Sequence, residues 1–105
     1  MSECHTRIEG DTAIVVLGGE VDLSWSAQVR REVLAALGRA PRVKIDLSGV
    51  EYIDSSGIAA LVEGFQSARG KGQPFALVNV SGPVLAVLKL ARLDQVFPIQ
   101  DAADD

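Results

Sequence analysis

Two adjacent serines at Asp54-Ser55-Ser56-Gly57 stand directly before a run of apolar residues at helical spacing. Aspartate and serine are favoured helix N-caps, because their side-chain oxygens accept hydrogen bonds from the first, otherwise unpaired, N–H groups. A serine on the first helical turn can also carry a phosphate, since the positive end of the helix dipole tolerates the added charge of about −1.5 to −2. The motif therefore predicts a helix cap, a phosphorylation site, or both.

A helical projection at about 100° per residue separates the two serines. The apolar side chains of the segment gather on the side opposite Ser56: Ile58, Leu61, Val62 and Phe65. Ser55 falls at the edge of this expected buried face. We therefore expect the hydroxyl of Ser56, rather than that of Ser55, to face solvent.

Mostly small residues continue the expected exposed side of this helix below Ser56: Ala60, Glu63, Gly64 and Ser67. A glycine inside a helix costs about 0.5–1 kcal/mol relative to alanine, so its presence at position 64 needs a reason. We expect the backbone of a partner protein to come close to Gly64. A larger residue there should then abolish binding and leave the fold intact.

Acidic residues are expected near the serines and would shape any switch there. Asp22, Asp54 and Glu63 would add to the negative potential of a phosphate on Ser56. Repulsion and desolvation would then change what can dock on this surface without unfolding it. These residue types predict a switch in which the interface changes and the fold does not.

Other chemistry-bearing residues lack the partners that their chemistry needs. His5 is the only histidine and has no cysteine or carboxylate at metal-ligand spacing, and Ser56 does not lie in a GxSxG elbow. Gly70-Lys71-Gly72 lacks the frame of a phosphate-binding loop and is typical of a helix end. Cys4 has no neighbour that would activate its thiol. We expect no catalytic residue, no metal site and no bound cofactor.

The composition is that of one globular domain over residues 1–105, with 48% hydrophobic residues, 23% charged residues and a net charge of −4. An acidic chain without a basic face is not expected to bind nucleic acid or an anionic membrane. No apolar run approaches the roughly 18–20 residues of a membrane span. The lone cysteine and the charged first residues favour a cytoplasmic protein without a signal peptide. Residues 100–105 are expected to form a flexible acidic tail.

Apolar periodicity and turn residues predict the elements that must position the serine motif. In chain order we expect strands over 5–9 and 12–17, a helix over 22–37, a strand over 43–47, a helix from the serine motif to residue 69, a strand over 75–80, a helix over 83–91 and a strand over 96–99. Strands that alternate with helices imply parallel pairing and right-handed crossovers. The expected fold is α/β: a small, mostly parallel sheet with helices mainly on one face and an antiparallel N-terminal edge strand.

Two apolar features leave alternatives open. We expect Trp25 to be a partly buried ring at the start of its helix, the alternative being an exposed anchor for a partner. Leu90 projects off the core stripe of the last helix, and we expect the C-terminal segment with Phe97 to bury it. The alternative is a hydrophobic patch for a partner or a homodimer, which nothing else in the sequence indicates.

The run DLSGVEYIDSSGIAAL, with LGGEVDL upstream and LARLDQVFPI downstream, resembles the STAS-domain anti-sigma-factor antagonists of bacteria. The resemblance covers about residues 7–99. It implies a small cytosolic protein that binds an anti-sigma factor, usually a serine kinase, and frees the sigma factor. It also implies that the kinase phosphorylates Ser56, which breaks the complex, and that a phosphatase resets it. Asp22 matches an acidic position of the family beside the phosphoserine, while Trp25 departs from the smaller or polar residue usual there.

The expected partner-binding residues around Ser56 are Asp22, Asp54, Ser55, Gly57, Ala60, Glu63 and Gly64. One alternative is a non-phosphorylated STAS scaffold subunit of a lipid-transport or signalling assembly. The intact serine pair favours the switch, because many scaffolding members carry threonine or a non-acceptor at this position. A small-molecule-binding or enzymatic domain is the weakest of the three hypotheses, since the sequence contains neither a catalytic pair nor a cofactor loop.

Overall fold

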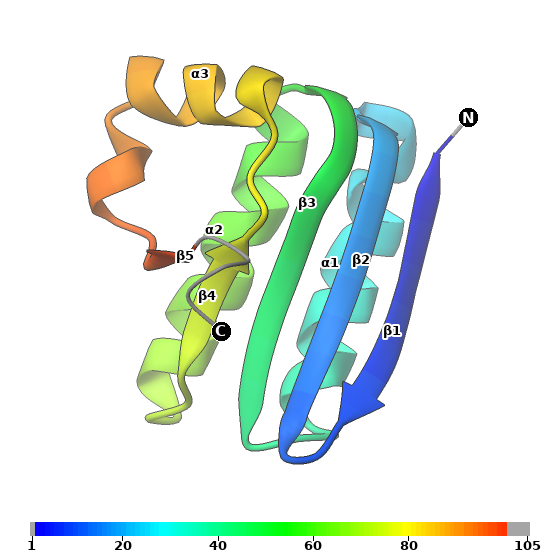
Figure 1. Ribbon diagram of the computed structural model, residues 1–105, viewed down its shortest axis with the longest axis vertical. Helices are drawn as coiled ribbons and strands as arrows, with labels where there is room; N and C mark the ends of the chain where they lie inside the picture. The colour runs from blue at the N-terminus through cyan, green and yellow to red at the C-terminus, as the bar shows by residue number, and fades with distance from the viewer. Residues whose placement is uncertain (1, 101–105) are drawn as a thin grey trace.

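Five strands form one sheet in the spatial order β1-β2-β3-β4-β5 in the computed structural model, which describes residues 2–100 (Figure 1). The elements follow one another as β1 (Glu3–Glu9), β2 (Thr12–Val21), α1 (Leu23–Leu37), β3 (Arg42–Ile53), α2 (Ser55–Gly70), β4 (Phe75–Val78), α3 (Gly82–Leu90), the 3-10 helix η1 (Leu93–Gln95) and β5 (Ile99–Gln100). β1 pairs antiparallel with β2, and the remaining neighbours pair parallel. The predicted α/β class, with its antiparallel edge strand, is confirmed.

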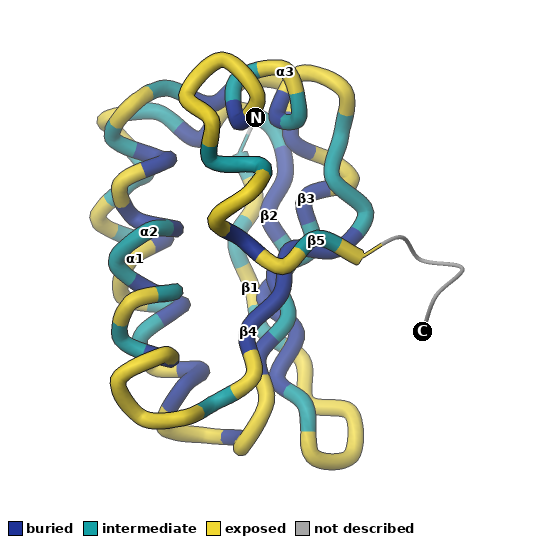
Figure 2. The backbone as a smooth tube through the Cα atoms, turned by 90° about the vertical axis from the view of Figure 1, so that its left-hand side faces the viewer, coloured by how far each residue is buried: buried dark blue, intermediate teal, exposed yellow. Residues whose placement is uncertain are grey.

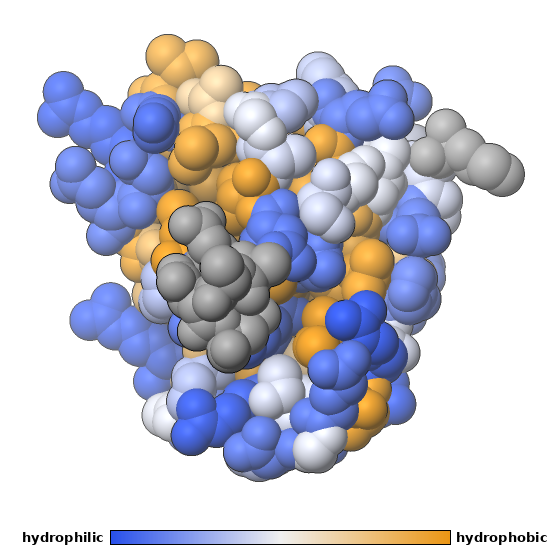
Figure 3. Space-filling model, in the orientation of Figure 1, coloured by the Kyte–Doolittle hydropathy of each residue, from blue (hydrophilic) through white to orange (hydrophobic). Residues whose placement is uncertain are grey.

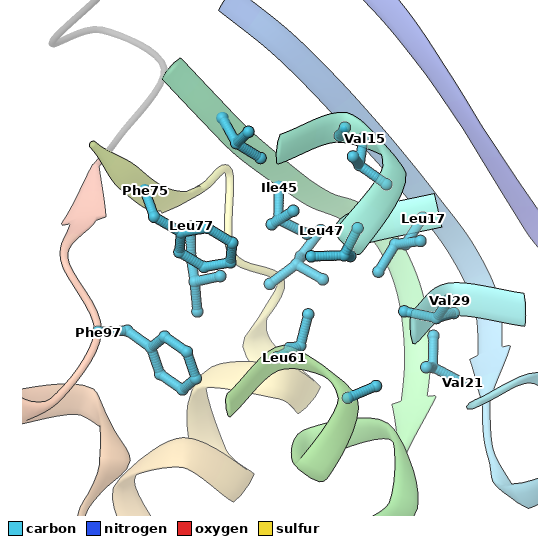
Figure 4. Packing of buried hydrophobic residues seen from close by; sticks show 14 of the residues in the cluster. Val15, Leu17, Val21, Val29, Ile45, Leu47, Leu61, Phe75, Leu77 and Phe97 are labelled. Atoms are coloured by element: carbon cyan, nitrogen blue, oxygen red, sulfur yellow. The ribbon is translucent and has the colours of Figure 1, made fainter. Parts of the chain in front are cut away.

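Helices α1 and α2 lie side by side against one face of the sheet (Figures 1 and 2). Strict alternation in β3 turns Val43, Ile45 and Leu47 toward the helices, and all three are buried. They share one hydrophobic cluster with Val29 of α1 and Leu61 of α2 (Figure 4). The sheet therefore holds both helices through a common core, and this fixes where each helix begins.

β2 and β3 are longer than the sequence predicted. β2, expected to end at residue 17, runs to Val21, and β3, expected to end at residue 47, runs to Ile53. The pairing between them absorbs two register shifts, which hydrophobic periodicity does not reveal. Gly18 and Gly49 lie opposite each other between these shifts. The extra length carries β3 directly to Asp54 without an intervening loop.

A tight turn at Gly10 and Asp11 joins β1 to β2, as predicted. Gly10 has a φ of 61°, a left-handed value that favours glycine, and no atom lies within 4 Å of the position that a Cβ would take there. Figure 1 shows this turn at the end of the molecule opposite to the starts of α1 and α2.

The C-terminal segment with Phe97 does not cover Leu90, although the sequence predicted that it would. Phe97 is 4% exposed, and its ring packs against Phe65 of α2 with the ring centroids 5.4 Å apart. The segment thus packs on α2 and leaves Leu90 87% exposed, so the expected burial of Leu90 is wrong. Hydrophobic residues gather at the surface over α3 in Figure 3. Residues 100–105 were expected to form a flexible tail. Gln100 instead belongs to β5 and pairs with Val78 of β4, while residues 101–105 lie outside the described part of the chain.

Candidate functional site

Asp54 caps the first turn of α2. Its Oδ1 accepts hydrogen bonds from the backbone N–H groups of Ser56 at 3.0 Å and Gly57 at 3.1 Å. Its carbonyl oxygen accepts a third bond from the N–H of Ile58 at 3.0 Å. The predicted helix cap is confirmed, with Asp54 rather than Ser55 as the capping residue.

The hydroxyl of Ser56 donates to the same Oδ1 of Asp54 at 2.6 Å. This bond, followed in size by the one from the N–H of Gly57, lowers the pKa of the Asp54 carboxyl below its ordinary value. The carboxylate is therefore ionised at neutral pH. It fixes the Ser56 hydroxyl in one orientation at the positive end of the helix dipole.

The expected contrast between the two serines is reversed. Ser55 is exposed, whereas Ser56 is only half exposed. The helical projection placed the sheet-facing side correctly, but α2 has a second neighbour, α1, on the side of Ser56. Ser56 lies at the edge of the contact between the two helices instead of on a free face.

The small-residue stripe below Ser56 faces α1. Ala60 is 5% exposed, and Gly64 is also buried. A Cβ on Gly64 would lie 2.4 Å from Cγ1 of Val33, a residue of α1. The group that approaches Gly64 is therefore the Val33 side chain of this same protein, and the expectation that the backbone of a partner approaches there is wrong. Ala60 and Gly64 lie where the two helices meet, and both are buried rather than exposed on a free face.

Position 57 must be a glycine because the first turn of α2 packs closely against the ends of two strands. A Cβ at this position would lie 2.5 Å from the carbonyl oxygen of Val21 and 2.8 Å from Cγ1 of Ile53. The first turn of α2 can approach the ends of β2 and β3 only because this side chain is absent. Gly57 is buried, and it serves the site by allowing this approach.

Asp22 caps α1 in the same way that Asp54 caps α2. Its Oδ1 accepts bonds from the backbone N–H of Ser24 at 2.9 Å and from the Ser24 hydroxyl at 2.5 Å. The two caps adjoin, because the Asp54 N–H donates to the carbonyl of Val21 at 3.3 Å. The N–H of Leu23 also contributes to lowering the pKa of Asp54. Two acidic caps therefore stand together at one end of the molecule.

Two exposed apolar side chains accompany these caps, and sequence reasoning had not singled them out. Leu23, directly after Asp22, is 77% exposed, and Tyr52, two residues before Asp54, is 51% exposed. Neither belongs to an apolar periodicity, so no pattern marked them. Trp25 is partly buried in the first turn of α1, as expected.

A shallow groove of about 260 Å³ separates the N-terminal halves of α1 and α2. Its lining residues are Ser26, Ala27, Arg30, Ser56, Ala59, Ala60 and Glu63. Arg30 and Glu63 form an ion pair across it, with about half of each side chain exposed. Nothing in the order of residues brings Arg30 to Glu63, so the sequence did not predict this ion pair.

No cluster of three histidine, cysteine, aspartate or glutamate side chains suited to a metal ion occurs among residues 2–100. Within the same part of the chain, no helix combines the length and the apolar character needed to cross a membrane. The described residues at this end of the molecule offer several serine hydroxyls, two capping carboxylates and one arginine–glutamate pair.

The chain is similar to a group of known regulatory proteins. A family model described as "Mlab, STAS domain" matches residues 4–100. The chain is 30% identical over 90 residues to an anti-sigma F factor antagonist of Paenibacillus polymyxa, which covers 84% of this chain and 77% of that protein. It is 30% identical over 86 residues to an anti-sigma-B factor antagonist of Bacillus subtilis strain 168, covering 81% and 78%. A crystal structure of an anti-sigma factor antagonist from Mycobacterium paratuberculosis matches with a TM-score of 0.85 at 26% identity, over 94% of this chain and 85% of that chain.

Proposed function

The chain belongs to the STAS domain family, and from this premise we propose that it is an anti-sigma-factor antagonist controlled by phosphorylation of Ser56. In its unmodified form it binds an anti-sigma factor of the serine-kinase class, and this binding releases the sigma factor. Phosphorylation of Ser56 by that kinase breaks the complex, and a phosphatase restores it. The chain acts by binding and has no catalytic role of its own.

The observation that carries this proposal is the setting of the Ser56 hydroxyl. It is half exposed on the first turn of α2, and the ionised Asp54 holds it in one orientation at 2.6 Å. A kinase that approaches this end of the molecule meets a hydroxyl at a defined position. In the transfer, Ser56 Oγ bonds to the γ-phosphorus of ATP, the bond to the bridging oxygen of ADP breaks, and the hydroxyl proton leaves to a base of the kinase.

The exposed surface around the caps supports partner binding. Leu23 and Tyr52 offer apolar contact area near the carboxylates of Asp22 and Asp54. Apolar anchors beside charged groups are the usual composition of a protein interface, in which buried aromatic and aliphatic side chains carry most of the binding energy. We propose that Asp22, Asp54 and Ser55 contact the anti-sigma factor together with these two side chains.

Electrostatics explain why the phosphate would end binding. A phosphoserine adds a charge of about −1.5 to −2 beside the two capping carboxylates. A partner surface complementary to the unmodified site would then meet an excess of negative charge, together with the cost of desolvating a phosphate. The positive end of the α2 dipole offsets part of the added charge, so the domain remains folded while it loses its partner.

The test uses a purified serine-kinase anti-sigma factor from the same organism. With ATP, the wild type and Ser55→Ala are expected to gain the mass of one phosphate, whereas Ser56→Ala gains none. Ser55→Ala is the matched control, because Ser55 is the neighbouring and more exposed hydroxyl. Phosphorylation that persists in Ser56→Ala and is lost in Ser55→Ala would place the acceptor at Ser55 and refute the assignment.

Binding to the same anti-sigma factor separates the switch from the scaffold alternative. Ser56→Asp is expected to lose binding, measured by calorimetry, while its melting temperature stays near that of the wild type. A constitutive STAS scaffold subunit would tolerate Ser56→Asp. Wild-type affinity in that variant would therefore reject the switch and favour the scaffold.

A further inference from the structure

We propose that Arg30 of α1 receives the phosphate on Ser56, exchanging its present partner Glu63 for the phosphoserine. This inference rests on the phosphorylation of Ser56 proposed above, and it names the residue of this chain that binds the phosphate. Three relationships carry it: the hydrogen bonds at the α2 cap, the groove beside Ser56, and the Arg30–Glu63 ion pair.

The α2 cap cannot hold a phosphate in the place of the present hydroxyl. Esterification removes the hydrogen that Ser56 donates to Asp54 Oδ1 at 2.6 Å, and it sets a phosphate against an ionised carboxylate. The backbone N–H groups of Ser56, Gly57 and Ile58 already donate to Asp54. The phosphate therefore meets repulsion at the cap, where these three N–H groups are already used, and the side chain of residue 56 must turn away from Asp54.

The groove between α1 and α2 is the space into which it can turn. Ser56 lines this groove, and the neighbouring lining residues Ala27, Ala59 and Ala60 are small. The groove volume of about 260 Å³ is well above the roughly 10–15 Å³ that a cavity needs, on the same measure, to hold one water molecule. The groove therefore has room for a phosphate.

Arg30 is the cation that lines this groove, and its present bond is easy to exchange. Arg30 and Glu63 are 54% and 45% exposed, and ion pairs in such solvated positions are weak. A phosphate offers nearly twice the charge of a carboxylate and three acceptor oxygens, and the planar guanidinium can bind two of them at once. Arg30 should therefore leave Glu63 for the phosphate, and the Glu63 carboxylate is then released.

The exchange has a consequence for recognition. In the unmodified chain the Arg30–Glu63 pair closes the far end of the groove, and its two charges cancel. After the exchange, Arg30 is occupied by the phosphate and Glu63 presents an uncompensated charge about two helical turns below Ser56. The surface therefore changes over a wider area than the phosphate itself covers.

The experiment uses full-length chain with phosphoserine encoded genetically at position 56, so that no kinase is needed. The second pKa of the phosphate is measured by phosphorus NMR in four backgrounds: the intact chain, Arg30→Gln, Arg31→Gln and Glu63→Gln. Arg31 is the matched control, because it lies on the same helix, bonds to Gln28 and does not line the groove. The charged groups that line the groove or cap beside the phosphate are Arg30, Glu63 and Asp54.

We expect Arg30→Gln to raise the phosphate pKa by about one unit, because an adjacent cation favours the dianion. Arg31→Gln should leave it unchanged. Glu63→Gln, which removes the competing carboxylate, should leave it equal to or below that of the intact phosphoprotein. Equal phosphate pKa values in Arg30→Gln and Arg31→Gln would overturn the inference.

Melting of the unmodified variants shows whether each one folds. Arg30→Gln, Arg31→Gln and Glu63→Gln are each expected to melt near the wild type, because both arginines are exposed and the Glu63 side chain is 45% exposed. Failure of the kinase to phosphorylate Ser56 would refute the proposed function, whereas the NMR result on encoded phosphoserine tests Arg30 alone. The two outcomes are thus separable.

Discussion

Gly64 of α2 lies against Val33 of α1 so closely that a Cβ on the glycine would be 2.4 Å from Val33 Cγ1. The absence of a side chain at Gly64 therefore allows the two helices to approach each other at this point. It brings the N-terminal halves of α1 and α2 side by side and so defines the groove that contains Ser56 and Arg30. The geometry of the candidate site depends on a contact well below it.

Gly64→Ala is expected to destabilise the fold by about 1–3 kcal/mol, because the added methyl group overfills a closed contact. Urea unfolding followed by circular dichroism measures the change. Gly70→Ala on the same helix is the matched control, since nothing lies within 4 Å of the Cβ it would add. It should be neutral or stabilise by up to about 1 kcal/mol. Similar losses in both variants would contradict a steric cause.

Urea unfolding can also test whether Val33 is the residue that a Cβ at position 64 would clash with. In a Val33→Ala background the methyl groups that meet the new Cβ are gone, so Gly64→Ala should cost less than it does in the wild type. Contacting residues typically couple by about 0.5–3 kcal/mol. Additive losses in the double variant would show that Val33 is not the obstacle.

Ser56→Ala is expected to raise the pKa of Asp54, because the hydroxyl of Ser56 makes the largest contribution to lowering it. A lowered carboxyl pKa adds stability above the unfolded pKa of about 3.9, and this is lost as the pH falls through the folded value. The variant should therefore lose less stability on acidification than the wild type. Carbon NMR titration of the Asp54 carboxyl checks the shift. Ser55→Ala, which keeps the bond from Ser56 to Asp54, should leave the Asp54 pKa unchanged.

Cys4 is expected to react slowly with alkylating reagents. Burial, followed by the nearby charge of Glu32, raises the pKa of its thiol to about 11. The thiolate is thus scarce at pH 8, and iodoacetamide should label the folded chain far more slowly than the urea-unfolded chain. The same shift makes the folded state lose stability as the pH rises from about 8.5, the unfolded thiol pKa, to about 11. Glu32→Gln should speed labelling only modestly, since burial is the larger cause.

Leu90→Lys is expected to leave stability within about 0.5 kcal/mol of the wild type, because surface substitutions rarely do more. Its neighbour Leu88, which is fully buried, is the contrast. Leu88→Ala should cost about 2–5 kcal/mol through lost burial and the cavity left behind. Thermal unfolding compares the two, and a large loss in Leu90→Lys would mean that the side chain is covered.

Much of the fold was predictable because most of its elements bury one regular face. The alternation of Val43, Ile45 and Leu47 identified a strand, and Asp54 before a helical run identified a cap. The ends of β2 and β3 were not predictable, since their register shifts leave no mark in hydropathy.

The site was harder to predict than the fold. A helical projection finds the largest apolar face, here the one on the sheet, and treats every other side as solvent. Ala60 and Gly64 occupy a second buried face, whose small residues resemble an exposed stripe in sequence. Arg30 and Glu63 are 33 residues apart, and only the packing of α1 on α2 shows that they meet.

The hairpin turn at Gly10 and Asp11 lies at the far end of the molecule from Ser56, and a side chain added at Gly10 would meet open space. That separation makes the turn a suitable place to tether the protein. A chain immobilised there on a sensor surface, or carrying a fluorescent tag in the turn, would present both helix caps freely to a kinase in solution. Association and release could then be followed in real time without a label near the hydroxyl.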